Sequence, residues 1–329
     1  MARPSGGAGR LKTWATRGVQ LTLTALVTWF IFARVGVTLD EIRAGEGILD
    51  WRPEPLRLGV SCLVLMAGYG ISAVIWSRMV RDLGGPLLAP FSAVRLFMIA
   101  NLGRYVPGKV WQIAGLAALA RGRGVAPGIA TGSAILGQGI ALVAATGIGL
   151  GALLTAPEGA YRSWGLAAAA IMAVVVVLIA IPPFFRAGAT LWFRVARTDA
   201  PESLESVHGL RWLVLYTLNW AVYALSFWLF VASFDASAAV VPVASAFAAA
   251  YVLGYVAIFA PAGLGIREGA LVVFLTPHLG IGPAGGLALL ARLWTTAVEV
   301  IPAGAFWAHH AASPPSAAPQ AGVGEGSHE

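Results

Sequence analysis

The sequence predicts an all-α polytopic membrane protein, and its composition and patterning lead to that prediction. Of 329 residues, 58% are hydrophobic and only 11% are charged, whereas an average soluble domain has about 25% charged residues. A mean hydropathy of +0.78 leaves too little polar surface for contact with water, so lipid must cover most of the apolar side chains. Uncharged runs close to the length of a bilayer crossing recur along the chain. An ordinary soluble globular protein is therefore excluded.

Six runs with few or no charged residues are expected to be full crossings. They cover residues 19–33, 58–77, 128–157, 163–185, 212–234 and 285–307. The first follows a basic N-terminal arm, residues 1–18, and lacks a convincing small-residue cleavage site. We therefore interpret it as a retained helix rather than a removed signal peptide.

Two further apolar segments, residues 87–120 and 240–276, are interrupted. Proline removes a backbone donor and glycine relaxes the φ restriction, so each segment is predicted to form a helix, a break and a second helix. The break residues are Pro107, Gly108, Pro261, Gly263 and Gly265. The halves of the first segment are too short to cross about 30 Å, which favours two re-entrant helix pairs. Eight full crossings are the alternative.

Lysine and arginine concentrate in the N-terminal arm and in the loops near residues 78–81, 121–123 and 186–211. The positive-inside rule then places both termini in the cytoplasm of a cell whose plasma (inner) membrane holds the protein. The first broken pair would open from the cytoplasm and the second from outside, which is typical of an inverted internal repeat.

The predicted organisation is a single membrane domain, residues 19–310, followed by a polar, Pro/Gly-rich tail over 311–329 that we expect to be disordered. The repeat-like halves would cover 19–185 and 209–310. A connector over 186–208 mixes aromatic and basic residues and is suited to lie at the headgroups.

Charged side chains near the breaks are the candidate functional residues. A charge at the centre of a membrane helix costs about 2.5 to 3.5 kcal/mol on insertion scales, which suggests a function. Lys109 and Arg267 would each follow a break, at the start of a half-helix, where free N–H groups already favour an anion. Two such helix starts would form a phosphate site. The predicted substrate-binding residues are Asn101, Arg104, Lys109, Gln112, Arg267, Glu268, Arg292 and Glu299.

Other interpretations of these charges are open. An arginine near a helix end often reaches the interface and binds lipid phosphate without specificity. Glu268 could stabilise Arg104 or Lys109, and Glu299 could form a buried pair with an arginine. The sequence offers no metal site, no nucleotide-binding loop and no Ser/His/Asp set, so we expect no cofactor, no metal and no nucleic-acid partner.

Around the two breaks the sequence resembles the transmembrane region of the lysylphosphatidylglycerol synthase/flippase family, the membrane part of bacterial multiple peptide resistance factors. The stretches 101–112 and 261–269 carry the resemblance, and with the surrounding segments it covers about residues 15 to 310. Ala262 stands where a glycine is expected in the second motif. The resemblance implies a stand-alone flippase-like protein, because the chain stops soon after the last membrane helix.

The resemblance implies movement of a phospholipid or lipid-linked molecule between leaflets, without the aminoacyl transfer of full-length relatives. The expected partners are that lipid and a separately encoded lipid-modifying enzyme. One alternative is a membrane-embedded enzyme or accessory subunit in polyprenyl-linked glycolipid or aminoacyl-lipid metabolism. Its best carboxylates would be Glu268 and Glu299, although the sequence lacks an Asp-x-Asp metal motif. A scaffold subunit without transport is a third class.

Overall fold

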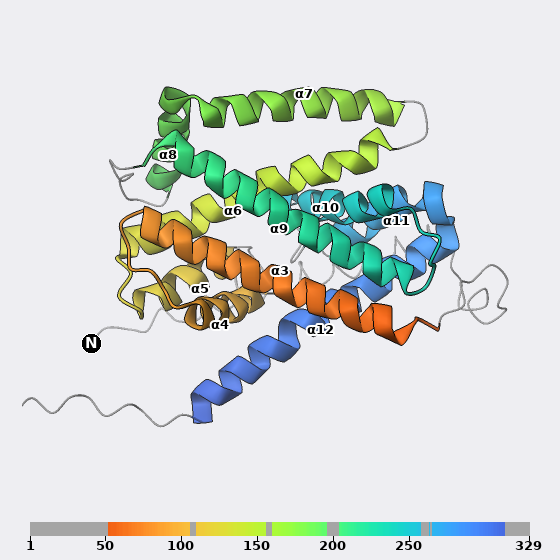
Figure 1. The fold of residues 1–329 in the computed structure, drawn as a ribbon, viewed down its shortest axis with the longest axis horizontal. Coiled ribbons are helices and arrows are strands. Elements are labelled where there is room, and N and C mark those ends of the chain that lie inside the picture. Colours follow the sequence, from red (N-terminus) through yellow and green to blue (C-terminus); the bar gives the residue numbers. More distant parts are fainter. Residues whose placement is uncertain are drawn as a thin grey trace, which may run out of the picture.

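The computed structural model describes residues 52–105, 110–155, 160–195, 204–257, 263 and 265–312, and within them every regular element is a helix (Figure 1). The all-α prediction is thus confirmed for this part of the chain. The predicted N-terminal arm, the first crossing and nearly all of the predicted tail lie outside it. The elements are α3 (Pro55–Asp82), α4 (Pro90–Asn101), η1 (Leu102–Tyr105), α5 (Val110–Arg121), α6 (Pro127–Leu154), α7 (Ala160–Ala180), α8 (Pro182–Val195), α9 (Ser206–Ala232), α10 (Val240–Val256), α11 (Ile266–Leu279) and α12 (Ile281–Ala312).

Four of these helices are long and apolar enough to cross a membrane. They are α3, α6, α9 and the first 26 residues of α12. A rise of about 1.5 Å per residue makes each longer than the hydrocarbon core of about 30 Å. They correspond to four of the six predicted crossings, and a fifth candidate is the bent pair α7–α8.

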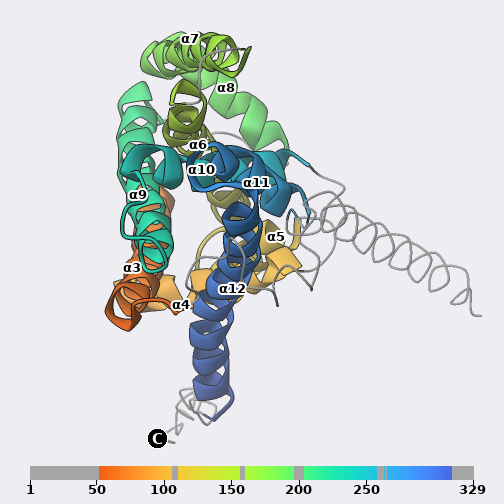
Figure 2. The same cartoon turned by 90° about the vertical axis from the view of Figure 1, so that its right-hand side faces the viewer.

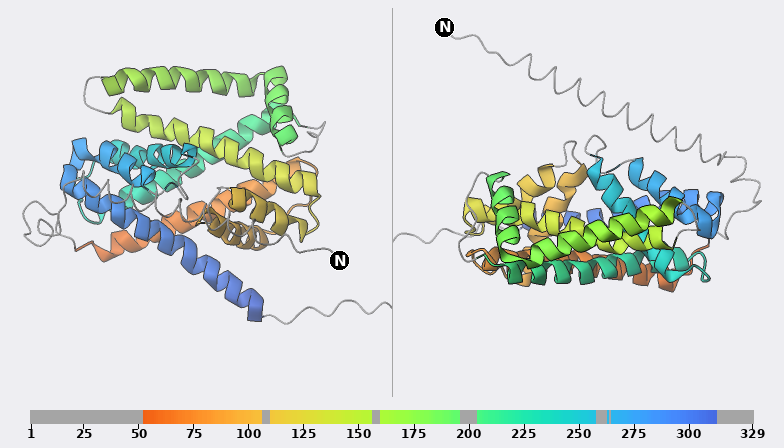
Figure 3. Two further views of the ribbon diagram at one scale, coloured as in Figure 1. Left: turned by 180° about the vertical axis from the view of Figure 1, so that it is seen from behind. Right: turned by 90° about the horizontal axis from the view of Figure 1, so that it is seen from above.

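The chain turns sharply between α7 and α8. The two helix axes differ by 95°, and the turn comes at residue 181, before the predicted crossing ends at 185. Pro182 and Pro183 explain the early turn, because proline lacks a donor and disfavours helical backbone in the residue before it. In α8, Phe193 is buried whereas Leu191 and Trp192 are exposed. Figure 3 shows α8 turning away from the end of α7 toward the rest of the bundle.

Both interrupted segments form the predicted helix, break and helix. In the first, α4 and α5 have 12 residues each, about 18 Å at the helical rise, so neither crosses the bilayer alone. In the second, α10 has 17 residues and α11 has 14. The two helices of each pair pack against one another. These contacts agree with hairpin-like pairs rather than with four separate crossings.

The helix ends gather into two groups, one at each end of the bundle. At the first end, the side chains of Arg211 and Trp212 donate hydrogen bonds to the carboxylate of Asp82, which ties the start of α9 to the end of α3. At the opposite end, the backbone N–H of Glu54 donates to the carbonyl of Ser233 over 2.7 Å. The chain leaves α3 at the first end and begins α4 there, whereas it leaves α9 at the opposite end and begins α10 there. The two broken pairs therefore start from opposite ends of the bundle (Figure 1). The inverted repeat itself stays a prediction.

Small residues let neighbouring helices approach closely. A Cβ atom on Gly68 of α3 would lie 2.7 Å from the ring of Tyr223 on α9, and one on Gly149 of α6 would lie 2.8 Å from the backbone nitrogen of Ala249 on α10. Such close packing is typical of membrane helices. Figure 2 shows α3 and α9 together on one side of the bundle, with α12 running past the broken pairs.

Candidate functional site

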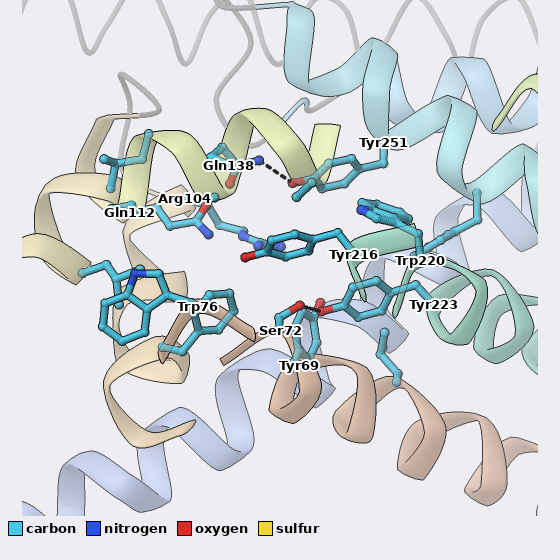
Figure 4. A pocket seen from close by; sticks show the side chains of 18 of the residues that line it. Tyr69, Ser72, Trp76, Arg104, Gln112, Gln138, Tyr216, Trp220, Tyr223 and Tyr251 are labelled. Atoms are coloured by element: carbon cyan, nitrogen blue, oxygen red, sulfur yellow. Dashed lines mark hydrogen bonds between the residues drawn. The ribbon is translucent and has the colours of Figure 1, made fainter. Parts of the chain in front are cut away.

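The two breaks border a common pair of cavities inside the bundle. The larger, about 80 Å³, has side chains of α3, α6 and α9 in its wall together with residues of both broken segments (Figure 4). The smaller, about 50 Å³, lies toward α12. Four side chains belong to both walls: Arg104, Gln112, Tyr251 and Arg267. Each broken segment therefore contributes one arginine and one neutral polar residue to the boundary between the cavities.

The first break places Arg104 through a tight backbone contact. A Cβ atom on Gly103 would lie 2.7 Å from the backbone nitrogen of Gln112, so only glycine lets η1 lie against the start of α5. The amide of Gln112 donates to Asn101 Oδ1 over 2.7 Å and joins α5 to α4. Arg104 Nη2 lies 3.5 Å from the same oxygen. These contacts fix the direction of the Arg104 guanidinium.

The second break depends on two glycines with positive φ, Gly263 at +69° and Gly265 at +83°. Both lie in the left-handed region, where only glycine has no steric penalty. The backbone N–H of Gly265 donates to Glu268 Oε2 over 2.7 Å, so Glu268 caps its own helix, α11. Arg267, in the first turn of α11, is left to point toward the cavities, and it appears in both walls.

Glu299 of α12 is the most completely compensated charge of the site. It is only 2% exposed, and its carboxylate accepts a hydrogen bond from Arg104 Nη1 over 2.6 Å. The hydroxyl of Tyr105 donates to the other oxygen over 2.7 Å, and the hydroxyl of Tyr69 on α3 also donates to this carboxylate. A carboxylate held by a guanidinium and two hydroxyl groups tolerates burial that an isolated one would not.

The other two arginines are less closely compensated by carboxylates. The guanidinium of Arg267 lies over the ring of Phe247, 4.7 Å from its centroid, a cation–π contact. Arg292 Nη1 lies 3.9 Å from Glu268 Oε1, and its guanidinium carbon is 5.6 Å from the ring centre of Tyr105. Three arginines and two glutamates give this part of the described chain a formal charge of +1 (3 − 2 = 1).

The structure brings together most of the residues that the sequence predicts for the site. Arg104, Gln112, Arg267, Arg292 and Glu299 line one or both cavities, Asn101 contacts two of them, and Glu268 faces Arg292. Lys109, Pro107, Gly108 and Pro261 lie outside the described residues.

The ion pair formed by Arg104 differs from the one that the sequence suggested. Arg104 pairs with Glu299 rather than with Glu268, whose carboxylate is turned toward the start of its own helix. In the described ranges, no three His, Cys, Asp or Glu side chains come close enough to hold a metal ion.

Aromatic residues are the part of the site that the sequence reasoning missed. Six of the seven tyrosines line a cavity. These are Tyr69, Tyr105, Tyr216, Tyr223, Tyr251 and Tyr255. Tyrosine in membrane helices is most common at the headgroup level, so a group at mid-helix is a deviation that periodicity could have revealed. Tyr216 and Tyr223 are seven residues apart, and Tyr251 and Tyr255 four apart, so each pair shares a helix face.

Neither curated proteins nor solved structures give a match to the chain. A family described as "Lysylphosphatidylglycerol synthase TM region" does match, over residues 18–303, which include every described helix before α12 and most of α12 itself. The match agrees with the resemblance carried by the two breaks, and the apolar helices agree with a membrane location. The chain therefore belongs to the family of lysylphosphatidylglycerol synthase transmembrane regions.

Proposed function

We propose that this protein moves a phospholipid or lipid-linked molecule between leaflets and holds the headgroup phosphate between its two breaks. The observation that carries the proposal is that Arg104 and Arg267, one from each broken segment, lie in the walls of both cavities. Guanidinium groups form strong charge-assisted hydrogen bonds with phosphate. Arginines placed in this way suit an anion that passes between the cavities.

The position of the cavities along the helices supports transport rather than simple anchoring. Tyr69 lies near the middle of α3, Gln138 toward the middle of α6 and Tyr216 well inside α9, and all three line the larger cavity. An arginine that only anchors the protein at a headgroup layer would lie at the level where the crossing helices end. Binding sites at mid-membrane between broken helices are typical of transporters that alternate their access.

The proposal includes location and partner. We place the protein in the plasma (inner) membrane with both termini in the cytoplasm, because the basic loops lie at one end of the bundle. A lipid-modifying enzyme on a separate chain would supply the lipid. Lys109, which follows the first break in the sequence, is proposed as a third phosphate-binding cation.

A lipid-exchange assay with purified full-length protein tests the proposal. The protein is reconstituted into phosphatidylcholine vesicles that contain a trace of fluorescent phosphatidylglycerol, and reduction of the outer-leaflet fluorophore measures exchange. We expect the protein to accelerate exchange and Arg267→Ala to slow it at least about tenfold, because one charge-assisted hydrogen bond contributes about 1.5–3 kcal/mol. Arg267→Lys, which keeps the charge, should slow it less.

Arg123→Ala is the matched control, because Arg123 is an exposed arginine in the turn after α5. It should exchange lipid at the rate of the unmodified protein. Equal rates for Arg267→Ala and Arg123→Ala, with both proteins folded, would refute the phosphate site. Mass spectrometry of the recovered lipid tests the alternative, since an enzyme would return a chemically altered lipid and a flippase would not.

A further inference from the structure

The charges that face the larger cavity have a single sign. Among the described residues that form its wall, the ionised side chains are Arg104 and Arg267, and none is a carboxylate. Each broken segment therefore contributes one cation to this wall, and neither contributes a carboxylate to it.

The carboxylate at the smaller cavity is already engaged. Glu299 accepts hydrogen bonds from Arg104, Tyr69 and Tyr105, so both of its oxygens have donors. A cationic headgroup would have to compete with a guanidinium 2.6 Å away for this acceptor, while Arg267 on the same wall would repel it. The cavity pair is thus unfavourable for an ammonium group.

The rest of the larger wall is aromatic or neutral and polar. Trp76 and Trp220 contribute indole rings to this wall, and Ser72, Gln138 and Tyr216 contribute hydroxyl and amide groups (Figure 4). Gln138 and Tyr251 bond to one another over 3.3 Å, a long contact that a ligand hydroxyl could replace. Ring faces combined with neutral donors and acceptors suit the hydroxyl groups and C–H surfaces of a polyol or sugar.

We infer that the lipid carried by this protein is anionic, with a phosphate and an uncharged, hydroxyl-rich headgroup, and that a lipid with a cationic aminoacyl headgroup is rejected. The phosphate binds at the shared wall between Arg104 and Arg267, and the headgroup lies among the aromatic and amide side chains of the larger cavity. This inference rests on the proposed function, because it names the substrate of the same site.

Two parallel measurements on the full-length protein test the inference. Exchange rates in phosphatidylcholine vesicles are compared for fluorescent phosphatidylglycerol and fluorescent lysyl-phosphatidylglycerol, and binding of short-chain forms of both lipids is measured by calorimetry in detergent. We expect phosphatidylglycerol to bind at least about tenfold more tightly and to exchange faster. Equal or tighter binding of the lysyl lipid overturns the inference. Preferential binding of phosphatidylglycerol without exchange refutes transport but supports the headgroup preference.

A substitution in the wall shows whether charge sets this preference. Gln138→Glu places a carboxylate in the larger cavity, and we expect it to reduce the preference for phosphatidylglycerol by about tenfold or more. Gln138→Leu removes the same amide without adding charge and should leave the lysyl lipid as poorly bound as before. If Gln138→Glu proves unfolded, the comparison of the two lipids on the unmodified protein still decides the question.

Discussion

Glu299 combines structural and electrostatic roles in one side chain. Its carboxylate joins α12 to η1 through Arg104 and Tyr105, and to α3 through Tyr69. The Arg104 side chain is 19% exposed, so water compensates it only in part. When one partner of a buried ion pair is removed, the other charge is left without compensation.

We expect Glu299→Gln to lower the free energy of unfolding by about 3 kcal/mol, because it leaves the Arg104 guanidinium without a counter-ion. The measurement is the melting temperature in detergent. Glu54→Gln is the control, since Glu54 pairs with Arg57 at the surface over 2.7 Å with its side chain 45% exposed, and such pairs contribute at most about 1 kcal/mol. Similar melting temperatures for both variants would contradict the assigned role of Glu299.

Charged residues of the site stand out in the sequence more clearly than the aromatic ones do. Arg104, Arg267 and Glu299 stand out because ionised groups in apolar segments are rare. Their pairing was not predictable, because Arg104 and Glu299 are 195 residues apart and no local pattern joins them. Tyr223 and Tyr251 attract less attention in a chain with abundant aromatic residues. The spacing of Tyr223 from Tyr216 and of Tyr251 from Tyr255 nevertheless carries some signal, because each pair shares a helix face.

Each break depends on a glycine at a place where two backbone segments meet. A Cβ atom on Gly263 would lie 2.9 Å from the carbonyl oxygen of Gly254, and its φ of +69° is unfavourable for any other L-residue. Backbone at membrane depth must be enclosed by protein or water, because lipid offers no hydrogen bonds. This contact encloses the second break between α10 and α11.

Gly263→Ala should therefore destabilise the protein by about 1–3 kcal/mol. It should also move Arg267, because Gly254 lies between Gly263 and Arg267. A Cβ atom on Gly254 would lie only 3.1 Å from the Arg267 Cβ, so a Gly254 backbone displaced by the new methyl group would press against Arg267. Melting temperature and lipid exchange are both expected to fall. Gly59→Ala is the control, because Gly59 lies in α3 with no atom within 4 Å of the added Cβ, and alanine there should keep or raise the melting temperature. A Gly263→Ala protein as stable and active as Gly59→Ala would exclude this role.

Helix positions followed from the sequence better than their ends did. Long apolar runs predicted α3, α6, α9 and α12, and the breaks predicted two short pairs. The α7 crossing was predicted to end at 185, whereas Pro182 and Pro183 end it at Ala180. A hydrophobicity pattern cannot show this turn, because apolar residues continue through it into α8.

Positive charges are more numerous at one end of the bundle than at the other. Arg81, Arg123 and Arg211 belong to helix ends and turns that meet at one end. At the other end Arg57 is paired with Glu54, and the turn after α9 contains Asp235. Such asymmetry is what the positive-inside rule uses to orient a membrane protein.

Accessibility of introduced cysteines checks the proposed orientation. In a Cys62→Ser background, we expect Ala236→Cys to react with a membrane-impermeant maleimide on intact cells. Arg123→Cys should react only after the membrane is permeabilised. Both positions are exposed in the structure, so burial would not explain a difference. The reverse pattern of labelling would invert the orientation and the face from which each broken pair opens.

The overall architecture was predictable to the level of helices and breaks, but the cavities were not. Periodicity and proline positions act within one segment, whereas the cavity walls combine α3, α6, α9, α10 and both breaks. Their meeting depends on close helix contacts such as that of Gly149 with Ala249, which arise only in three dimensions.

The hydrogen bond between Arg104 and Glu299 also has a kinetic consequence. Because Glu299 belongs to the same chain, its carboxylate acts as a competing anion at a high effective concentration beside the guanidinium. If Arg104 binds a lipid phosphate as proposed, that phosphate would gain only the difference between its own attraction and that of this carboxylate. The dissociation rate of the phosphate would be correspondingly higher, which would suit the proposed transporter because it must unload one molecule before it can accept the next.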